Sequence, residues 1–434
     1  MYPRRSPTEP MVTFAPVRTT IRPAIPKTFT ELGIPEQLAL DLMLRRLMVE
    51  GQSTLASLSR SLRIAIPIVD QFFKHMRNQH LVEVKGMVAN DYQFVLSAAG
   101  KQLASERTQI SQYAGACPVP LKDYHAAVKA QAAKVNLDRQ TLKAAFSDLI
   151  ISDTMLDQLG PAIISQNSIF MYGPTGNGKT SLAERMLRVY KDAVLIPYAV
   201  EVDNQVISLY DPVVHQPVDF DDPDMDPRWV VCKRPCIIVG GELVPSMLEL
   251  RLDDGSGIYA APLQMKANNG ILIIDDFGRQ LMSPRDLLNR WIVPLDRRVD
   301  YLTLRYGVKF QIPFESMVVF STNLDPADLA DEAFLRRIHN KILVDAVDPA
   351  AFDKIFDRVV RARQIEPEPE SAEHLRALCL TDGRTELRAC YPSDICTILA
   401  SIGRYERRPA VMTKTELERA VQLYFAKTQI RQDF

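Results

Sequence analysis

The hydrophobic pattern of the first hundred residues predicts helices followed by strands. Apolar residues recur at helical spacing over 35–50, and two shorter stretches repeat the pattern. Ser53 or Thr54 suits the cap of the second helix, and Pro67 suits the first turn of the third. The pattern then changes to two apolar runs around a polar turn, as in a hairpin. We expect helices over 35–50, 53–62 and from Pro67, strands over 81–85 and 92–96, and a helix from about Ser97.

Three short apolar runs in the middle of the chain predict buried strands of a parallel sheet. They cover residues 168–172, 271–274 and 317–321. Strands of a parallel sheet are covered on both faces, and they therefore read as nearly continuous apolar runs. Polar residues follow each run, and in open α/β sheets ligands bind at the carboxyl ends of the strands. We therefore expect an α/β fold with a functional site at that edge.

Much of the remaining chain has a helical repeat. Two strand patterns around a glycine turn over 299–312 predict a further hairpin. Asp153 suits the N-cap of the helix that leads into the first core strand. Residues 193–257 are the least readable part of the chain. Further helices are expected over 121–134, 137–151, 153–165, 181–188, 283–292, 349–363, 371–380, 392–405 and 413–426.

A glycine-rich segment follows the first core strand. Gly173-Pro174-Thr175-Gly176-Asn177-Gly178-Lys179-Thr180 fits the pattern G-x-x-x-x-G-K-[ST], with a strand before it and a helix after it. Its glycines let the backbone form a nest of N–H groups that point at phosphate oxygens, next to a helix N-terminus. The lysine reaches the β- and γ-phosphates, and the threonine hydroxyl can ligate Mg²⁺. We expect this segment with Ser181 to bind ATP, and Thr180 to hold Mg²⁺.

Acidic, amide and basic side chains follow the other two core strands. Asp275 is placed to hold Mg²⁺, and Asp276 is placed to polarise the attacking water as a general base. Asn323, after the neighbouring strand, can position that water against the γ-phosphate. Arg336 and Arg337 come about a dozen residues later. They are either a salt-bridged helix end or an arginine finger that completes a neighbouring subunit's site.

Together, these four segments resemble the AAA+ ATPase family in order and spacing, as Walker A, Walker B, sensor 1 and the finger region. The resemblance covers the chain from about Asp153 onward. It implies a doubly wound ATPase core, a helical lid and a ring of subunits, usually a hexamer. It also implies that Arg337, with Arg336 as second choice, reaches the adjacent subunit's γ-phosphate. The hairpin at 299–312 and the segment 261–270 resemble the MoxR-like branch, whose members are mostly thought of as chaperone-type remodellers.

Two positions depart from the family's pattern. Asp276 stands where glutamate is commoner, and its side chain is one methylene shorter. Ser393 stands where the sensor 2 arginine usually follows the proline at the start of a lid helix. That arginine is therefore either missing or supplied by Arg388 or Arg384.

Residues 29–108 resemble a winged helix-turn-helix domain in their order of three helices and a two-stranded wing. The candidate recognition helix offers only Lys74, His75 and Arg77 as basic residues. That is a thin footprint compared with the stripe of phosphate contacts that a DNA reader needs. DNA binding therefore stays open for this domain, beside protein–protein docking or a structural role.

Two loops have alternative interpretations. The acidic residues over 219–226 resemble a metal-binding loop, but they lack a fixed ligand spacing, which favours a solvated loop. The glycine-rich loop at 255–259 ends in Tyr259. This tyrosine either grips a polypeptide in the pore of a ring or packs on its own domain.

Composition limits location and partners. The 434 residues carry a formal net charge of −1, so no global attraction to nucleic acid or membrane is expected. No apolar run approaches the roughly 20 residues that span a bilayer, and the N-terminus lacks the apolar region of a signal peptide. The six cysteines are scattered, which favours reduced thiols in a cytoplasmic protein over a zinc site.

We expect five regions and one main function. The regions are a mostly disordered arm (1–28), a winged helix-turn-helix (29–108), linker helices (109–152), a doubly wound parallel-sheet AAA+ core (153–346) and a helical lid (347–434). The chain is expected to hydrolyse ATP with Mg²⁺ at the subunit interfaces of a homo-oligomeric ring and to remodel a partner protein. The alternatives are a DNA-binding regulator or loader and a nucleotide-sensing scaffold with little turnover.

Overall fold

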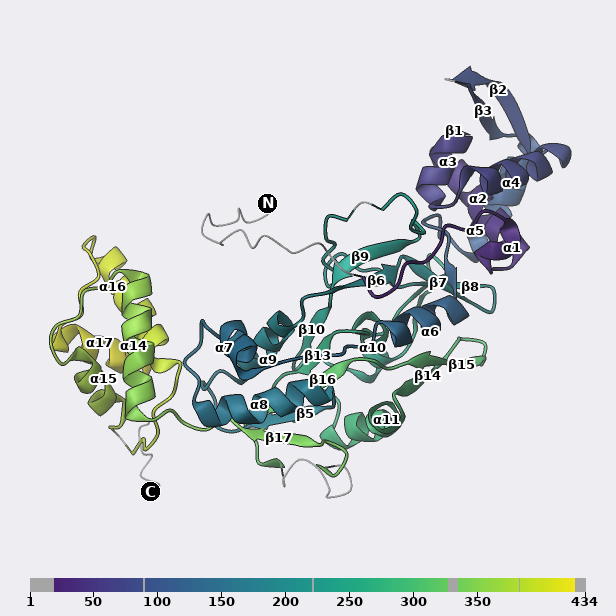
Figure 1. The fold of residues 1–434 in the computed structure, drawn as a ribbon. Coiled ribbons are helices and arrows are strands. Elements are labelled where there is room, and N and C mark those ends of the chain that lie inside the picture. Colours follow the sequence, from purple (N-terminus) through teal and green to yellow (C-terminus); the bar gives the residue numbers. More distant parts are fainter. Residues whose placement is uncertain (1–18, 89, 221, 327–334, 382, 426–434) are drawn as a thin grey trace, which may run out of the picture.

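The centre of the molecule is a five-stranded parallel sheet with the spatial order β10-β13-β16-β5-β17 (Figure 1). Neighbouring strands are paired in parallel along the whole sheet. The three predicted core strands are therefore confirmed, side by side. The strands are β5 (Ile169–Tyr172), β10 (Cys236–Val239), β13 (Ile271–Ile274), β16 (Met317–Thr322) and β17 (Asn340–Leu343). The computed structural model describes residues 19–88, 90–220, 222–326, 335–381 and 383–425.

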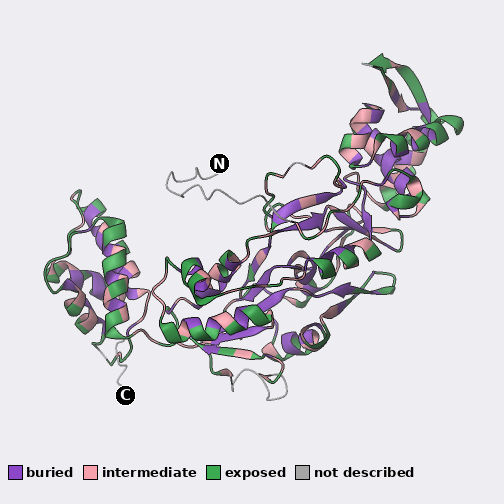
Figure 2. Cartoon of the chain, in the orientation of Figure 1, coloured by how far each residue is buried: buried purple, intermediate pink, exposed green. Residues whose placement is uncertain are grey.

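Helices cover both faces of this sheet, which confirms the α/β, doubly wound class. Ile271 and Ile273 of β13 pack toward α7, α8 and α9, whereas Leu272 and Ile274 pack toward α11 on the other face. Figure 2 shows the three central strands, β5, β13 and β16, as mostly buried and the outer faces of these helices as exposed. Ser152, not Asp153, caps α8. The helices are α7 (Arg139–Ala145), α8 (Asp153–Ser165), α9 (Lys179–Met186), η1 (Leu187–Val189), η2 (Pro245–Leu248), α10 (Leu263–Lys266) and α11 (Pro284–Arg297).

A second sheet fills the region that the sequence left unassigned. Its five strands have the spatial order β11-β12-β8-β7-β4, and two antiparallel pairs, β6·β9 and β14·β15, accompany it. The expected hairpin over 299–312 is confirmed as β14 and β15. The strands are β4 (Val119–Pro120), β6 (Ala193–Pro197), β7 (Ala199–Val202), β8 (Gln205–Ser208), β9 (Trp229–Lys233), β11 (Arg251–Asp253), β12 (Ile258–Ala260), β14 (Val299–Thr303) and β15 (Lys309–Pro313).

The segment expected to form linker helices, 109–152, is partly built into this second sheet. β4 pairs with β7, and α6 (Leu121–Ala130) buries Tyr124 and Val128 in the same apolar core. Tyr259 of β12 is 3% exposed, and its hydroxyl accepts a hydrogen bond from the Arg305 backbone. Of the two interpretations of Tyr259, packing on its own domain is therefore right and pore contact is wrong.

The N-terminal elements follow the predicted order, with one short helix, α1, and one short strand, β1, in addition. Thr54 caps α3 as expected, and a three-stranded sheet has the spatial order β1-β3-β2. Their own apolar core is separate from those of the two larger sheets. The elements are α1 (Phe29–Leu32), α2 (Glu36–Glu50), β1 (Gln52–Thr54), α3 (Leu55–Leu62), α4 (Ile66–Asn78), β2 (Val82–Val88), β3 (Asp91–Leu96) and α5 (Ala98–Ile110).

Residues 19–28 lie against the middle of the molecule, which corrects the expectation of a solvated tail for this part of the arm. Bridges join Thr19 to Ala193 and Ala24 to Met225. Arg22 donates to Asp222 at 2.6 Å, so ion pairs hold part of the acidic loop. Residues 1–18 lie outside the described part of the chain. Within the described residues, no group of three or more acids, histidines or cysteines could hold a metal ion.

The C-terminal helices form a separate bundle with its own apolar core. In Figure 1 this bundle and the N-terminal elements lie at opposite ends of the middle region. Among the described helices, none has the length and apolar character needed to cross a membrane. The helices are α14 (Pro349–Arg363), α15 (Ser371–Cys379), α16 (Tyr391–Tyr405) and α17 (Lys414–Tyr424).

Candidate functional site

The glycine-rich loop leaves the end of β5 and enters α9 in the conformation that its glycines allow. Gly173, Gly176 and Gly178 have φ values of 133°, 80° and 84°, which L side chains rarely adopt. A Cβ on Gly173 would also lie 2.4 Å from the carbonyl oxygen of Val344. Gly178 is the N-cap of α9, so the loop ends at the positive end of that helix. The strand, loop and helix that the sequence predicted are therefore present in this order.

Lys179 is folded toward the loop that precedes it. Its Nζ donates hydrogen bonds to the carbonyl oxygens of Gly173 at 2.8 Å and Pro174 at 2.9 Å. Burial lowers the pKa of the Lys179 ammonium, and the charges of Asp275 and Asp276 act in the opposite direction. Both predicted acids therefore lie close enough to act on this lysine.

Thr180 and Asp275 meet directly. The Thr180 hydroxyl donates to Asp275 Oδ2 at 2.8 Å, which joins the start of α9 to the end of β13. The Asp275 backbone N–H donates to Val239 at the end of β10, 2.8 Å away. Mg²⁺ is usually bound by one or two carboxylates together with substrate phosphates and waters. A hydroxyl and a carboxylate at this separation fit that ion.

Asp276 is held in an uncommon backbone conformation by a residue that the sequence did not suggest. Its φ is 48°, in the left-handed region. Gln280 Nε2 donates to the carbonyl oxygens of Asp275 at 2.9 Å and Asp276 at 3.2 Å, and its Oε1 accepts from Gly278. This amide therefore braces the turn that follows β13. An amide shortly after two acids and a glycine was the only sequence signal for it.

Asn323 follows β16, next to the acids. Phe277 N–H donates to Ser321 at 2.7 Å, and the Thr322 hydroxyl donates to Phe277 at 2.7 Å. These bonds fix the end of β16 against the turn that holds Asp276. The side-chain Oδ1 of Asn323 is buried and has no hydrogen-bond partner among the described residues.

The start of α16 contacts the glycine-rich loop. Arg388 Nη1 donates to Thr175 Oγ1 at 3.0 Å. The backbone N–H of Ala389 donates to Asn177 Oδ1 at 3.1 Å, and that of Cys390 donates to the Gly176 carbonyl at 2.9 Å. The C-terminal bundle therefore touches the loop over three consecutive residues.

Of the two arginines considered for the vacant sensor 2 position, only Arg388 contacts the loop in the described structure. Arg384 Nε donates to Cys379 at 3.0 Å, and its guanidinium lies 3.8 Å from the ring centroid of Phe425. It therefore belongs to the packing of the bundle.

Three buried polar atoms without hydrogen-bond partners among the described residues come from this group of side chains. They are Asn177 Nδ2, Asn323 Oδ1 and Arg388 Nε. Buried polar groups are rarely left unpaired in native proteins, and each such group calls for an explanation such as a bound ligand. Two donors, Asn177 Nδ2 and Arg388 Nε, and one acceptor, Asn323 Oδ1, could therefore bond a polar ligand.

The two arginines of the finger region differ in their surroundings. Arg337 Nε lies 3.0 Å from Asp296 Oδ2, in an ion pair within its own chain. Arg336 is exposed. The geometry therefore supports a salt bridge for one member of the pair and leaves the other available at the surface.

Comparisons with known proteins give one family match and several distant likenesses of structure. Residues 348–423, which include α14, α15 and α16, match a family described as a domain of unknown function (DUF8689). No curated protein matches the chain. A solved structure of NtrX from Brucella abortus in complex with ATP is 12% identical, with a TM-score of 0.37. It matches over 67% of this chain and 57% of the NtrX chain, which is less than two thirds of its length.

A second solved structure with this level of likeness is a molecular motor. The RuvB Holliday junction branch migration motor from Thermotoga maritima is 12% identical, with a TM-score of 0.34. The match spans 68% of this chain and 72% of that one.

Proposed function

We propose that this protein is a cytoplasmic AAA+ ATPase of the MoxR-like branch, which hydrolyses ATP at the subunit interfaces of a hexameric ring and remodels a partner protein. The observation that carries the proposal is the 2.8 Å contact between Thr180 and Asp275 at the carboxyl edge of the parallel sheet. A glycine-rich loop alone is a common turn. A hydroxyl and a carboxylate brought together beside it form the ion site that nucleotide hydrolysis requires.

Each residue of the site has a proposed part in this reaction. The backbone N–H groups of residues 173–181, except at Pro174, which has none, and the Lys179 ammonium hold the phosphates. Thr180 and Asp275 would bind Mg²⁺, which neutralises charge on the phosphate oxygens. Asp276 takes the proton of the attacking water, and the unpartnered Oδ1 of Asn323 orients that water.

Arg388 is the proposed replacement for the sensor 2 arginine. It reaches the loop from the C-terminal bundle and carries a guanidinium Nε without a partner among the described residues. A positive charge from this side would bind the phosphates and report their state to the bundle. Movement of the bundle on hydrolysis is the proposed source of mechanical work.

The proposed arginine finger is one of the pair Arg336 and Arg337. Exposure makes Arg336 the better placed to reach another subunit, although the sequence favoured Arg337. The ion pair between Arg337 and Asp296 would then position the segment that carries Arg336. This assignment requires the protein to assemble into a ring, and mixing inactive variants of the protein tests it.

A protein client is proposed in preference to DNA because of the surface of the N-terminal elements. Residues 29–108 contain nine lysines and arginines against eight aspartates and glutamates. A near-neutral module lacks the phosphate-binding charge that dominates DNA affinity. The β2–β3 hairpin instead exposes Val84, Met87, Val88 and Tyr92, and it is seen as the exposed end of these elements in Figure 2.

Steady-state ATP hydrolysis by the purified chain tests the proposal, with Lys179→Ala as the variant. We expect Mg²⁺-dependent turnover in the wild type and loss of nucleotide binding in the variant. Tight ATP binding without turnover at any protein concentration would favour the scaffold alternative. Binding of duplex DNA that weakens steeply with salt would favour the DNA-binding alternative.

A further inference from the structure

A single short strand, β9, has a buried arginine at each end. Arg228 precedes the strand and is 2% exposed, and Arg234 follows it and is 4% exposed. A guanidinium remains charged inside a protein, so it must be held by acceptors on all sides. The groups that hold these two arginines therefore show which parts of the molecule β9 joins.

The Arg228 end of β9 is held by the N-terminal part of the chain. Its Nη1 donates to the carbonyl oxygen of Leu32, the last residue of α1, at 3.2 Å, and to that of Pro118 at 3.1 Å. Asp226 pairs with the same guanidinium at 2.9 Å. The Asp226 N–H in turn donates to Pro23 at 2.9 Å. The Arg228 side chain thus fastens two segments directly, and the backbone of its partner Asp226 fastens a third.

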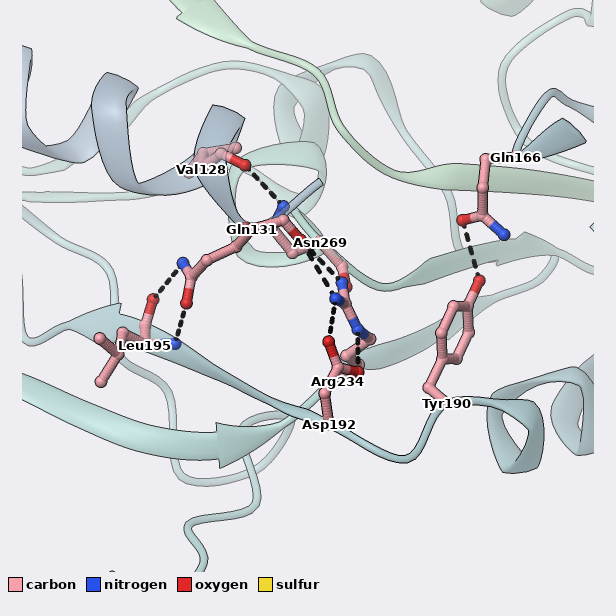
Figure 3. Close-up of polar contacts among 8 residues, drawn as sticks. All are labelled: Val128, Gln131, Gln166, Tyr190, Asp192, Leu195, Arg234 and Asn269. Carbon is pink, nitrogen blue, oxygen red and sulfur yellow. Dashed lines mark hydrogen bonds and ion pairs between the residues drawn. The ribbon is translucent and has the colours of Figure 1, made fainter. Parts of the chain in front are cut away.

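The Arg234 end of β9 is held beside the residues that immediately precede β13 (Figure 3). Arg234 Nη1 donates to the carbonyl oxygens of Asn269 at 2.7 Å and Gln131 at 3.1 Å, and its Nε donates to Asp192 at 2.8 Å. Gln131 also exchanges two hydrogen bonds with the backbone of Leu195. The close-up shows the guanidinium enclosed by these groups.

Backbone contacts lead from Pro235, which follows Arg234, to Asp275 at the proposed nucleotide site. Ile271 N–H donates to the Pro235 carbonyl at 2.9 Å, and a Cβ on Gly270 would lie 2.0 Å from that oxygen. β10 then runs in parallel with β13 to the bond between Asp275 and Val239. Asp275 is the carboxylate that holds Thr180.

We propose that β9 transmits movement between the nucleotide site and the N-terminal elements. A shift of β13 cannot be absorbed at Arg234, because breaking its bonds would leave a buried charge unpaired. The strand therefore moves as a unit, and Arg228 passes the shift to α1 and the segment before β4. Nucleotide would then change the affinity of the N-terminal elements for a partner. Because coupling is reciprocal, that partner would change the affinity for nucleotide by the same factor. This inference rests on the proposed function only in requiring that ATP binds.

Hydrogen exchange on the full chain tests the coupling, with and without Mg²⁺ and the slowly hydrolysed analogue ATPγS. We expect the nucleotide to slow exchange at the glycine-rich loop and also to change it by about twofold or more in 29–34, 116–121 and 225–229. In Arg234→Met, nucleotide should still slow exchange at the glycine-rich loop, while the change in the three distant segments is lost. Arg290→Met is the matched control, because Arg290 pairs with the buried Asp300 outside this route.

Two outcomes would overturn the proposal. One is a wild type in which nucleotide protects the loop but changes nothing in the three distant segments. The other is an Arg234→Met protein that keeps the distant change. Arg228→Met provides an independent variant at the other end of β9, and it should lose the change in 29–34 and 116–121. If the wild-type loop itself is not protected, ATP does not bind, and the proposed function fails instead.

Discussion

Arg388 donates a hydrogen bond to the hydroxyl of Thr175 across 3.0 Å, and thereby joins the C-terminal bundle to the glycine-rich loop. The neighbouring backbone bonds from Ala389 and Cys390 reinforce this contact. Phosphates bound in the loop would lie at this junction. Binding and release of nucleotide are therefore expected to change how the bundle sits on the core.

Replacing Arg388 should weaken nucleotide binding. Arg388→Met removes a charge-assisted contact beside the proposed phosphate site, and we expect the Kd for ATP to rise roughly tenfold. Titration with a fluorescent nucleotide would measure it. Arg384→Met is the matched control, since this arginine stacks on Phe425 within the bundle. Equal losses of affinity in both variants would contradict the assignment of Arg388.

A side chain at Gly176 should interfere with the loop in two separable ways. Its φ of 80° disfavours any L residue by about 1–2 kcal/mol, and its Cβ would lie 2.6 Å from Cys390 Sγ. We expect Gly176→Ala to lower both nucleotide affinity and thermal stability. Adding Cys390→Ala should recover the steric part of the loss and leave the backbone part. A double variant no better than the single one would exclude the contact with Cys390.

The hydroxyl of Thr180 should be needed for its chemistry rather than for its shape. Thr180→Val keeps the volume but removes the proposed Mg²⁺ ligand, and we expect turnover to fall by about 100-fold or more. Thr180→Ser retains the hydroxyl and should keep most of the activity. Steady-state rates over a range of Mg²⁺ concentrations would distinguish the two. Full activity in Thr180→Val would remove the hydroxyl from the proposed site.

The thiols should react slowly in the native protein, and their reactivity should rise with pH. Burial raises the pKa of Cys117, Cys236 and Cys396 to about 11, and that of Cys232 and Cys379 to about 12. Because the pKa of these thiols is raised in the folded state, they stay protonated there. Their protonated form therefore contributes to the stability of the fold at neutral pH, and this contribution is lost as pH rises toward 11–12. Alkylation with iodoacetamide, counted by mass spectrometry at pH 7.5 and 9.5 with and without urea, measures this. Rapid native alkylation of these five residues at pH 7.5 would contradict the burial of their thiols.

The sequence predicted the strands of the parallel sheet, with polar residues at their carboxyl ends, better than it predicted the second sheet. The strand over 168–172, the acids Asp275 and Asp276, and Asn323 were recognisable because each signal is local, namely an apolar run that ends in polar residues. The second sheet was missed because its strands are two to four residues long and pair across distant parts of the chain. Short apolar segments carry little periodicity, and their partners decide whether they become strands.

The sequence left Arg388 and Arg384 both open as the sensor 2 arginine because this choice, too, depends on packing between distant parts of the chain. Both arginines precede α16 closely in the sequence, and only the packing of the bundle places one on the glycine-rich loop and the other on Phe425. Gln280 was missed because an amide in a turn has no distinctive pattern. The helix cap at Ser152 differed by a single residue from the expected Asp153, and both residue types suit an N-cap.

Hydrolysis in a mixture of two inactive variants tests the central claim, ATP hydrolysis at a shared subunit interface, most directly. Lys179→Ala lacks the nucleotide site, whereas the double variant Arg336→Met with Arg337→Met lacks the proposed finger. We expect near-background activity from each alone. The mixture should recover activity, because some interfaces combine an intact loop with an intact arginine. No recovery on mixing, together with full activity of the arginine variant alone, would contradict the account.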